Sequence, residues 1–138
     1  MSLADIITKG VQKFSDDDET KSMFQSFEGD SVVLHLRGDK AVTFIVKDGR
    51  PIALEGEIEN PSAIAEIAAL EFTRFIDGRE HFGGLMIVEF GRYFQAKKGG
   101  FYDLGGDFML LGPISDRLMK IYREDPEFRG MVDKYKCE

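Results

Sequence analysis

Residues 31–59 have the sequence SVVLHLRGDKAVTFIVKDGRPIALEGEIE, and this stretch decides the fold. Apolar residues occupy every second position in three successive runs, and this period of two predicts three β-strands. Gly38-Asp39 separates the first two runs. Asp48-Gly49, whose residues both tolerate positive φ, predicts a two-residue hairpin between the second and the third. We therefore expect an antiparallel meander with one apolar face and one charged face.

Length and composition limit what surrounds this meander. The chain has 138 residues, 43% hydrophobic and 31% charged, which suits one domain over 1–138 with one core. A net charge of −7 argues against binding of a nucleic-acid backbone. No run approaches the roughly 20 apolar residues of a membrane span, and the first residues do not have the basic-then-apolar pattern expected of a signal peptide. The single cysteine, Cys137, allows neither an internal disulfide nor a cysteine-based zinc site. We expect a cytoplasmic protein without metal or cofactor.

Helical periodicity flanks the meander on both sides. In the N-terminal helix region, 1–28, apolar spacing predicts an amphipathic helix over 3–14 and a short turn after it. The acidic run 15–19 lacks the ligand spacing of a calcium loop, so we interpret it as a solvated, helix-capping segment. Near the other end, Pro113 predicts the first turn of a helix, and 124–138 is expected to be a C-terminal helical extension.

Residues 63–78 leave two alternatives open. Ser62 could cap one helix that runs to Ile76, or a strand over 63–68 could precede a helix over 70–77. The alanine and glutamate content favours the single helix. Gly78 ends a helix in both cases.

Residues 79–104 form a Gly/Phe-rich segment. Nine of the 15 glycines fall between 78 and 112, and seven of the 12 phenylalanines fall between 72 and 108. Within it, 85–98 is predicted to be a helix that is apolar on most sides and must therefore be covered on most sides. Met and Phe side chains between glycines suit a deformable apolar pocket. A homodimer seam is an alternative use of the same apolar surface.

Only a few polar residues are candidates for a catalytic role. His35 lies on the charged face of the first strand beside Arg37, where a surface position is expected. A small enzyme acting on an apolar substrate could use His81, Asp103 or Asp107 as its acid–base residue. Carboxylates that flank glycines more often form turns.

The order of these segments resembles the sterol carrier protein type 2 (SCP2) domain. The resemblance is carried by AVTFIVKDG at 41–49, ENPSAIAEI at 59–67, EFTRFIDG at 71–78 and GDFMLLG at 106–112. It implies an α+β fold: a five-stranded, mainly antiparallel sheet with helices over one face, enclosing an apolar tunnel. It also implies that 63–68 is a strand, that 71–77 is a helix, and that 108–111 is the last strand. The last strand and its helix then occupy 105–123.

The resemblance also implies a function. It implies non-enzymatic binding and transfer of a fatty acid, acyl-CoA, isoprenoid or sterol-like lipid, with transient membrane contact, by a monomer or homodimer. The tunnel residues it implies are Phe72, Phe75, Ile76, Phe108, Leu110 and Leu118. To these we add apolar residues of the Gly/Phe-rich segment and of the following helix: Leu85, Met86, Phe90, Phe94, Phe101 and Met119.

Overall fold

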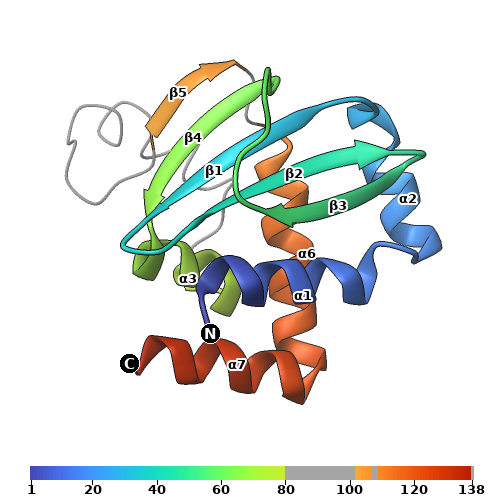
Figure 1. The fold of residues 1–138 in the computed structure, drawn as a ribbon. Helices are drawn as coiled ribbons and strands as arrows, with labels where there is room; N and C mark the ends of the chain where they lie inside the picture. The colour runs from blue at the N-terminus through green and yellow to red at the C-terminus, as the bar shows by residue number, and fades with distance from the viewer. Residues whose placement is uncertain (80–101, 107–108, 138) are drawn as a thin grey trace.

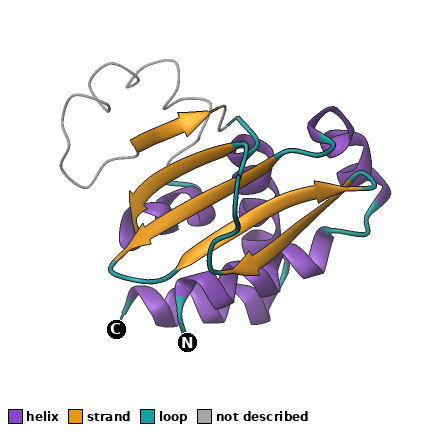
Figure 2. Cartoon of the chain, turned by 45° about the horizontal axis from the view of Figure 1, so that its top comes forward, coloured by secondary structure: helices purple, strands orange, loops and turns teal. Residues whose placement is uncertain are grey.

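A computed structural model describes residues 1–79, 102–106 and 109–137, and for 102–106 it describes the backbone. The helices are α1 (Leu3–Phe14), α2 (Asp18–Phe24), α3 (Ala69–Asp77), α6 (Leu111–Glu124) and α7 (Pro126–Lys136), with a 3-10 turn η1 (Gln25–Phe27). The strands are β1 (Ser31–Arg37), β2 (Ala41–Lys47), β3 (Arg50–Glu55), β4 (Ala63–Ala68) and β5 (Tyr102–Gly106). Figures 1 and 2 show the sheet with α1, α3, α6 and α7 on one side of it. The α+β class is confirmed.

The described strands form one mixed sheet in the order β3-β2-β1-β4-β5. The β1–β2, β2–β3 and β4–β5 pairs are antiparallel, whereas β1 and β4 are parallel. The predicted hairpin is confirmed, because Asp48 and Gly49 have φ values of 56° and 74° and directly join β2 to β3. Glu28 holds this turn by accepting the N–H groups of Asp48 and Gly49 at 2.9 and 2.7 Å.

Residues 63–78 form a strand followed by a helix. Ala63, Ala65 and Ile67 are buried in alternation, and β4 pairs with β1 along its whole length. Tertiary pairing therefore overrides the helix propensity of the alanines. The helix α3 ends at Gly78, whose φ of 89° is left-handed and suits glycine.

The prediction of a last strand over 108–111 is wrong for its described residues, because Met109 and Leu110 lie in a turn. The last described strand is β5, which pairs with β4 from Ala63 opposite Gly106 to Glu66 opposite Tyr102. Leu111 already begins α6, with Pro113 in its first turn. A short run that is apolar on both sides fits a buried strand or a buried helix start equally well by periodicity. The expected boundary at 104–105 between the Gly/Phe-rich segment and the last strand therefore falls inside β5.

The core lies between one face of the sheet and the helices. Val32, Leu34 and Phe44 project from the sheet and are fully buried. The predicted helix over 3–14 is confirmed as α1, which packs beneath β2 and β3. Gly10 of α1 allows a close approach, because a Cβ there would lie 2.6 Å from the ring of Phe128 in α7.

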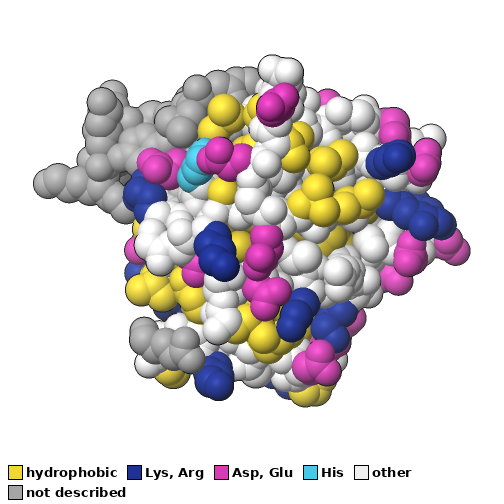
Figure 3. Space-filling model, in the orientation of Figure 1, with side chains coloured by type: hydrophobic (Ala, Val, Ile, Leu, Met, Phe, Trp, Pro, Cys, Tyr) yellow, Lys and Arg dark blue, Asp and Glu magenta, His cyan; other side chains and the backbone are white. Residues whose placement is uncertain are grey.

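The other face of the sheet is less uniformly charged than expected. Figure 1 shows the loop over 56–62 crossing this face between β3 and β4. The Thr43 hydroxyl donates to the carbonyl of Gly56 at 2.7 Å, and Val33 and Thr43 are buried. Ile52 and Leu54 of β3 are exposed, and Figure 3 shows apolar side chains gathered on the face turned to the viewer. Strand alternation predicted Ile52 and Leu54 on the apolar face of the meander, and this prediction is wrong, because the register places Ala53 opposite the buried Phe44 and Leu54 opposite Thr43. The loop across the other face was not predicted.

Candidate functional site

The α3 helix presents predicted tunnel residues to the interior. Phe72, Phe75 and Ile76 lie at helical spacing on its buried face, and each is at most 3% exposed. The rings of Phe72 and Phe75 are 5.9 Å apart. At this distance the two rings form a tilted aromatic pair. This face of α3 is therefore a continuous apolar surface.

The α6 helix supplies the opposite side of this interior. It packs against α3 and buries Leu118 and Met119, and Leu110 is buried at its N-terminal flank. The Met119 sulfur accepts a hydrogen bond from Arg123 at 3.3 Å and lies near Gly78 at the end of α3. We call the six residues Phe72, Phe75, Ile76, Leu110, Leu118 and Met119 the α3–α6 interior. The structure thus buries these six of the twelve predicted tunnel residues on α3, on α6 and at the start of α6, and α3 and α6 pack together.

The other six predicted residues lie outside the described residues. They are Leu85, Met86, Phe90, Phe94, Phe101 and Phe108. The predicted helix over 85–98 lies outside them as well, as do His81 and Asp107, and only the backbone of Asp103 is described. These assignments stay predictions.

A buried ion pair closes the C-terminal end of α3. The Asp77 carboxylate, 5% exposed, lies 2.8 Å from Arg79 Nε and 3.1 Å from Lys136 Nζ. Burial acts to raise the pKa of Asp77, but the hydrogen bonds from Arg79 and Lys136 outweigh it and lower that pKa. Asp77 therefore ties α3 to α7 as a carboxylate.

A second carboxylate of this kind ties α7 to α1. Asp39 accepts the N–H groups of Leu3 and Ala4, at 2.9 and 3.3 Å, and the hydroxyl of Tyr135 at 2.9 Å. Burial acts to raise the pKa of Asp39, and these hydrogen bonds, with that from Lys40, lower it overall. An anion at a helix N-terminus also interacts favourably with the helix dipole.

Arg117 is a charged residue that the sequence analysis missed. Its side chain is 6% exposed, with Nη1 3.2 Å from Glu19 and Nη2 3.8 Å from Asp17. Its Nε is buried without a hydrogen-bond partner among the described residues. The acidic run is exposed as predicted, yet it also anchors α2 to α6. The sequence contains a signal for the burial of Arg117, because this residue is three positions after Ile114 and so falls on the buried stripe of the helix.

The described residues offer little for metal binding or acid–base catalysis. His35 is partly exposed, with Nε2 3.0 Å from Glu57 Oε1, and neighbouring Arg37 lies 3.0 Å from Glu66. These pairs confirm the surface position expected for His35. Within the described part of the chain, no group of three or more His, Cys, Asp or Glu side chains could hold a metal ion.

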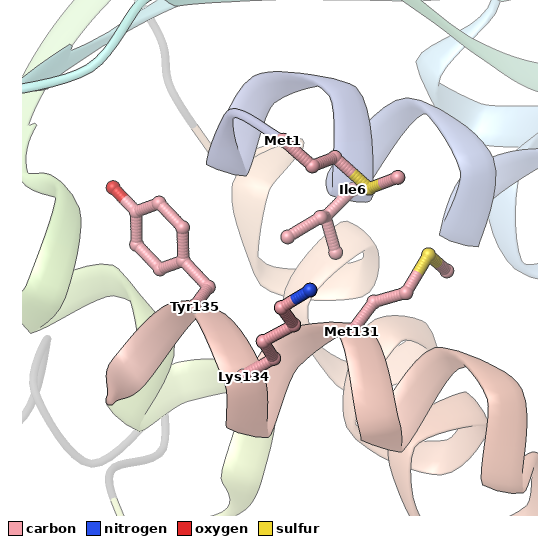
Figure 4. Close-up of a pocket in the computed structure, with 5 residues that line it drawn as sticks. All are labelled: Met1, Ile6, Met131, Lys134 and Tyr135. Carbon is pink, nitrogen blue, oxygen red and sulfur yellow. The ribbon is translucent and has the colours of Figure 1, made fainter. Parts of the chain in front are cut away.

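A separate apolar cleft of about 180 Å³ lies between α1 and α7. It is lined by Met1, Ile6, Met131, Lys134 and Tyr135. Figure 4 shows Lys134 extending its amine toward Ile6, between Tyr135 and Met131. Helical periodicity predicted the apolar faces of α1 and α7, but it could not predict that their packing leaves a cleft.

Comparison with solved structures identifies the fold. The UbiJ-SCP2 ubiquinone synthesis protein matches with a TM-score of 0.55 at 11% identity, over 91% of this chain and 98% of that one. Sterol carrier protein 2 matches with a TM-score of 0.55 at 17% identity, over 86% of this chain and 92% of that one. The chain has the sterol carrier protein 2 fold. A conserved hypothetical protein from Thermus thermophilus shares this fold, and a sterol carrier role has been suggested for it. It matches with a TM-score of 0.56 at 18% identity, over 90% of this chain and 88% of that one.

The likeness to the sterol carrier protein 2 fold is structural. No family model and no curated protein matches the chain in sequence. None of the described helices is long and apolar enough to cross a membrane.

Proposed function

We propose that this protein binds a lipid with an apolar chain and transfers it without catalysing a reaction. The observation that supports the proposal is that predicted tunnel residues are buried on α3 and α6, two helices that pack together within a sterol carrier protein 2 fold. Their side chains are hydrocarbon apart from the sulfur of Met119. Such an interior favours an alkyl or isoprenoid chain over a polar substrate.

Burial of the chain supplies the binding energy. Each methylene taken from water contributes about 0.8 kcal/mol, so a long chain binds without any dedicated polar contact. The described residues of the interior are at most 5% exposed, so a lipid has to displace part of their present packing. Met119 suits this requirement, because methionine adapts its shape to an irregular neighbour. The predicted residues Leu85, Met86, Phe90, Phe94, Phe101 and Phe108 complete the proposed tunnel.

The proposed cargo is a fatty acid, an acyl-CoA, an isoprenoid or a sterol-like lipid. One solved structure of the same fold is a ubiquinone synthesis protein, so an isoprenoid tail belongs among the ligands to be tested. We further propose that the protein acts in the cytoplasm as a monomer or homodimer and contacts membranes transiently.

Two measurements test the binding function. Native mass spectrometry of freshly purified protein, followed by organic extraction, should show a stoichiometric lipid adduct and identify its class. Because the chain contains no tryptophan, Phe75→Trp places a single tryptophan in the α3–α6 interior, and this residue can be excited selectively over the four tyrosines. Its emission should shift when oleate or an isoprenoid quinone is added.

Phe27→Trp is the matched control. Phe27 is partly buried in η1, and its ring centroid lies 6.5 Å from that of Phe24 in α2. Figure 1 shows α2, which η1 directly follows, on the opposite side of the molecule from α3. Its emission should not change with the same lipids. The absence of a co-purified lipid, together with an unchanged emission of Phe75→Trp, would contradict the proposal.

The enzyme alternative has its own test. The triple variant His81→Gln/Asp103→Asn/Asp107→Asn removes every acid–base candidate of the sequence analysis. We expect it to bind lipid as the wild type does. Chemical conversion of a bound lipid by the wild type, lost in this variant, would replace the carrier function by an enzymatic one.

A further inference from the structure

The cleft between α1 and α7 combines apolar walls with one lysine side chain. Met1 and Ile6 come from the N-terminal segment and α1, and Met131 comes from α7. Lys134 is exposed and forms no salt bridge among the described residues. None of the residues that line this cleft belongs to the α3–α6 interior.

One wall of the cleft is fixed and the others can adapt. The hydroxyl of Tyr135 donates to Asp39, which also accepts the N–H groups of Leu3 and Ala4 at the start of α1. These donors engage the Asp39 carboxylate, which reduces its repulsion of an anion in the cleft. The two methionines on the other side have several rotatable bonds and can fit a ligand of irregular shape.

The volume of the cleft sets the size of its ligand. A cavity of roughly 150 Å³ holds a benzene molecule, so a cleft of about 180 Å³ accommodates one aromatic ring or a chain of about six carbons. It is too small for the bulk of a long-chain lipid.

We infer that the α1–α7 cleft binds a compact monocarboxylic acid, with its apolar group between Met1, Ile6 and Met131 and its carboxylate at the Lys134 amine. The inference rests on the lining residues and the volume of the cleft and is independent of the proposed lipid function. An amine in the lining of an apolar cleft favours a carboxylate over a neutral or cationic group of the same size.

The test is a titration with 3-phenylpropionate followed by the NMR signals of the methionine methyl groups. We expect the Met1 and Met131 methyl signals to shift along one saturable curve, with a dissociation constant on the order of millimolar. The Met119 methyl signal, which reports on the α3–α6 interior, should stay in place. 3-Phenylpropylamine should cause much smaller shifts.

Two lysine variants isolate the role of the charge. Lys134→Gln should weaken binding of 3-phenylpropionate about two- to fivefold, as expected for an exposed ion pair. Lys47→Gln is the matched control, since Lys47 is also exposed and forms no salt bridge among the described residues. It removes the same net charge at the end of β2 and should leave the affinity unchanged.

Filling the cleft gives an independent check. Met131→Trp should weaken binding more than tenfold, because the indole occupies the space of the ligand ring. If this variant does not fold, Lys134→Gln still decides, because that side chain is exposed. Equal weakening by Lys134→Gln and Lys47→Gln, or equal binding of the amine and the carboxylate, would overturn the inference. Shifts at Met119 without shifts at Met1 and Met131 would overturn it too, while supporting the proposed lipid site.

Discussion

Arg117 of α6 is a buried cation whose partners lie at the surface. Its side chain is 6% exposed, whereas Asp17 and Glu19 are 58% and 65% exposed. An ion pair with such exposed partners contributes at most about 1 kcal/mol. The buried Nε without a partner among the described residues costs about 1–3 kcal/mol. The two effects oppose each other at one residue.

Arg117→Met should therefore leave stability almost unchanged or raise it. Methionine keeps the apolar stem and removes the unsatisfied donor, while Asp17 and Glu19 remain hydrated. We expect the free energy of unfolding in urea to fall by less than about 1 kcal/mol. For comparison, Leu118→Ala on the same helix should lower it by about 2–5 kcal/mol through cavity formation. A loss of about 3 kcal/mol or more in Arg117→Met would show that the ion pairs outweigh the unsatisfied donor.

Arg117 also shows that its position on the helix could be predicted from the sequence, whereas its ion-pair partners could not. The apolar stripe of α6 was predictable from Ile114, Leu118 and Ile121, because these residues recur at helical spacing. The partner of Arg117 was not, because Glu19 is far away in the sequence and pairs with it only after α2 packs on α6. Hydropathy assigns charged residues to the surface and so hides a buried one.

Among the elements, helix α1 depends on close packing against the C-terminal helices. A Cβ on Gly10 would lie 2.6 Å from Phe128 and 2.9 Å from Leu118. Gly10→Ala should therefore lower the free energy of unfolding by about 1–3 kcal/mol, although alanine is the better helix former. Thermal or urea unfolding followed by circular dichroism measures this change.

Gly130→Ala in α7 is the matched control for this packing effect. Gly130 is helical, and nothing lies within 4 Å of a Cβ placed there. Alanine should raise stability by up to about 1 kcal/mol, since only the helix propensity changes. If Gly10→Ala were stabilising as well, α1 would have room to move away from α7, and the close contact would not be a constraint.

The elements themselves were predictable to different degrees. The meander and α1 follow from periodicity, because both are long and regularly patterned. The strand at 63–68 followed by a helix could not be chosen from local pattern, because pairing with β1 decides it. The resemblance to a known family settled that alternative but misplaced the last strand. The six residues of the α3–α6 interior were placed by the resemblance and by the apolar pattern of the last long helix, and the cleft between α1 and α7 was not anticipated at all.

At the scale of the whole molecule, two carboxylates join α7 to the rest of the fold. Asp39 links the turn between β1 and β2 to the start of α1 and to Tyr135. Asp77 links the end of α3 to Lys136. Both have pKa values lowered from the ordinary value of 3.8, because their hydrogen bonds outweigh the effect of burial. Ionisation of these two groups therefore contributes to the attachment of α7, beside the buried Phe128 and Val132.

Stability should consequently fall in acid. A group whose pKa is lower in the folded state stabilises the fold fully above its unfolded pKa, and this contribution disappears as pH falls through the folded value. For Asp39 and Asp77 the loss begins as pH approaches the ordinary pKa of 3.8 from above and continues below it. Urea unfolding between about pH 7 and pH 2.5 should show a steady decline in the free energy of unfolding.

The variants Asp39→Asn and Asp77→Asn assign that decline to the two residues. In each variant the free energy of unfolding at neutral pH should be lower than in the wild type by about 1–3 kcal/mol, because the asparagine leaves charged or helix-terminal donors less well satisfied. The deficit relative to wild type should shrink as pH falls, since protonation removes the same charge from the wild type. Asp116→Asn, on an exposed residue of α6, should show no pH-dependent deficit. A deficit that stays constant across the whole pH range would mean that the variants lose packing and neutral hydrogen bonds and not an interaction of the charge. Ionised carboxylates would then not hold α7.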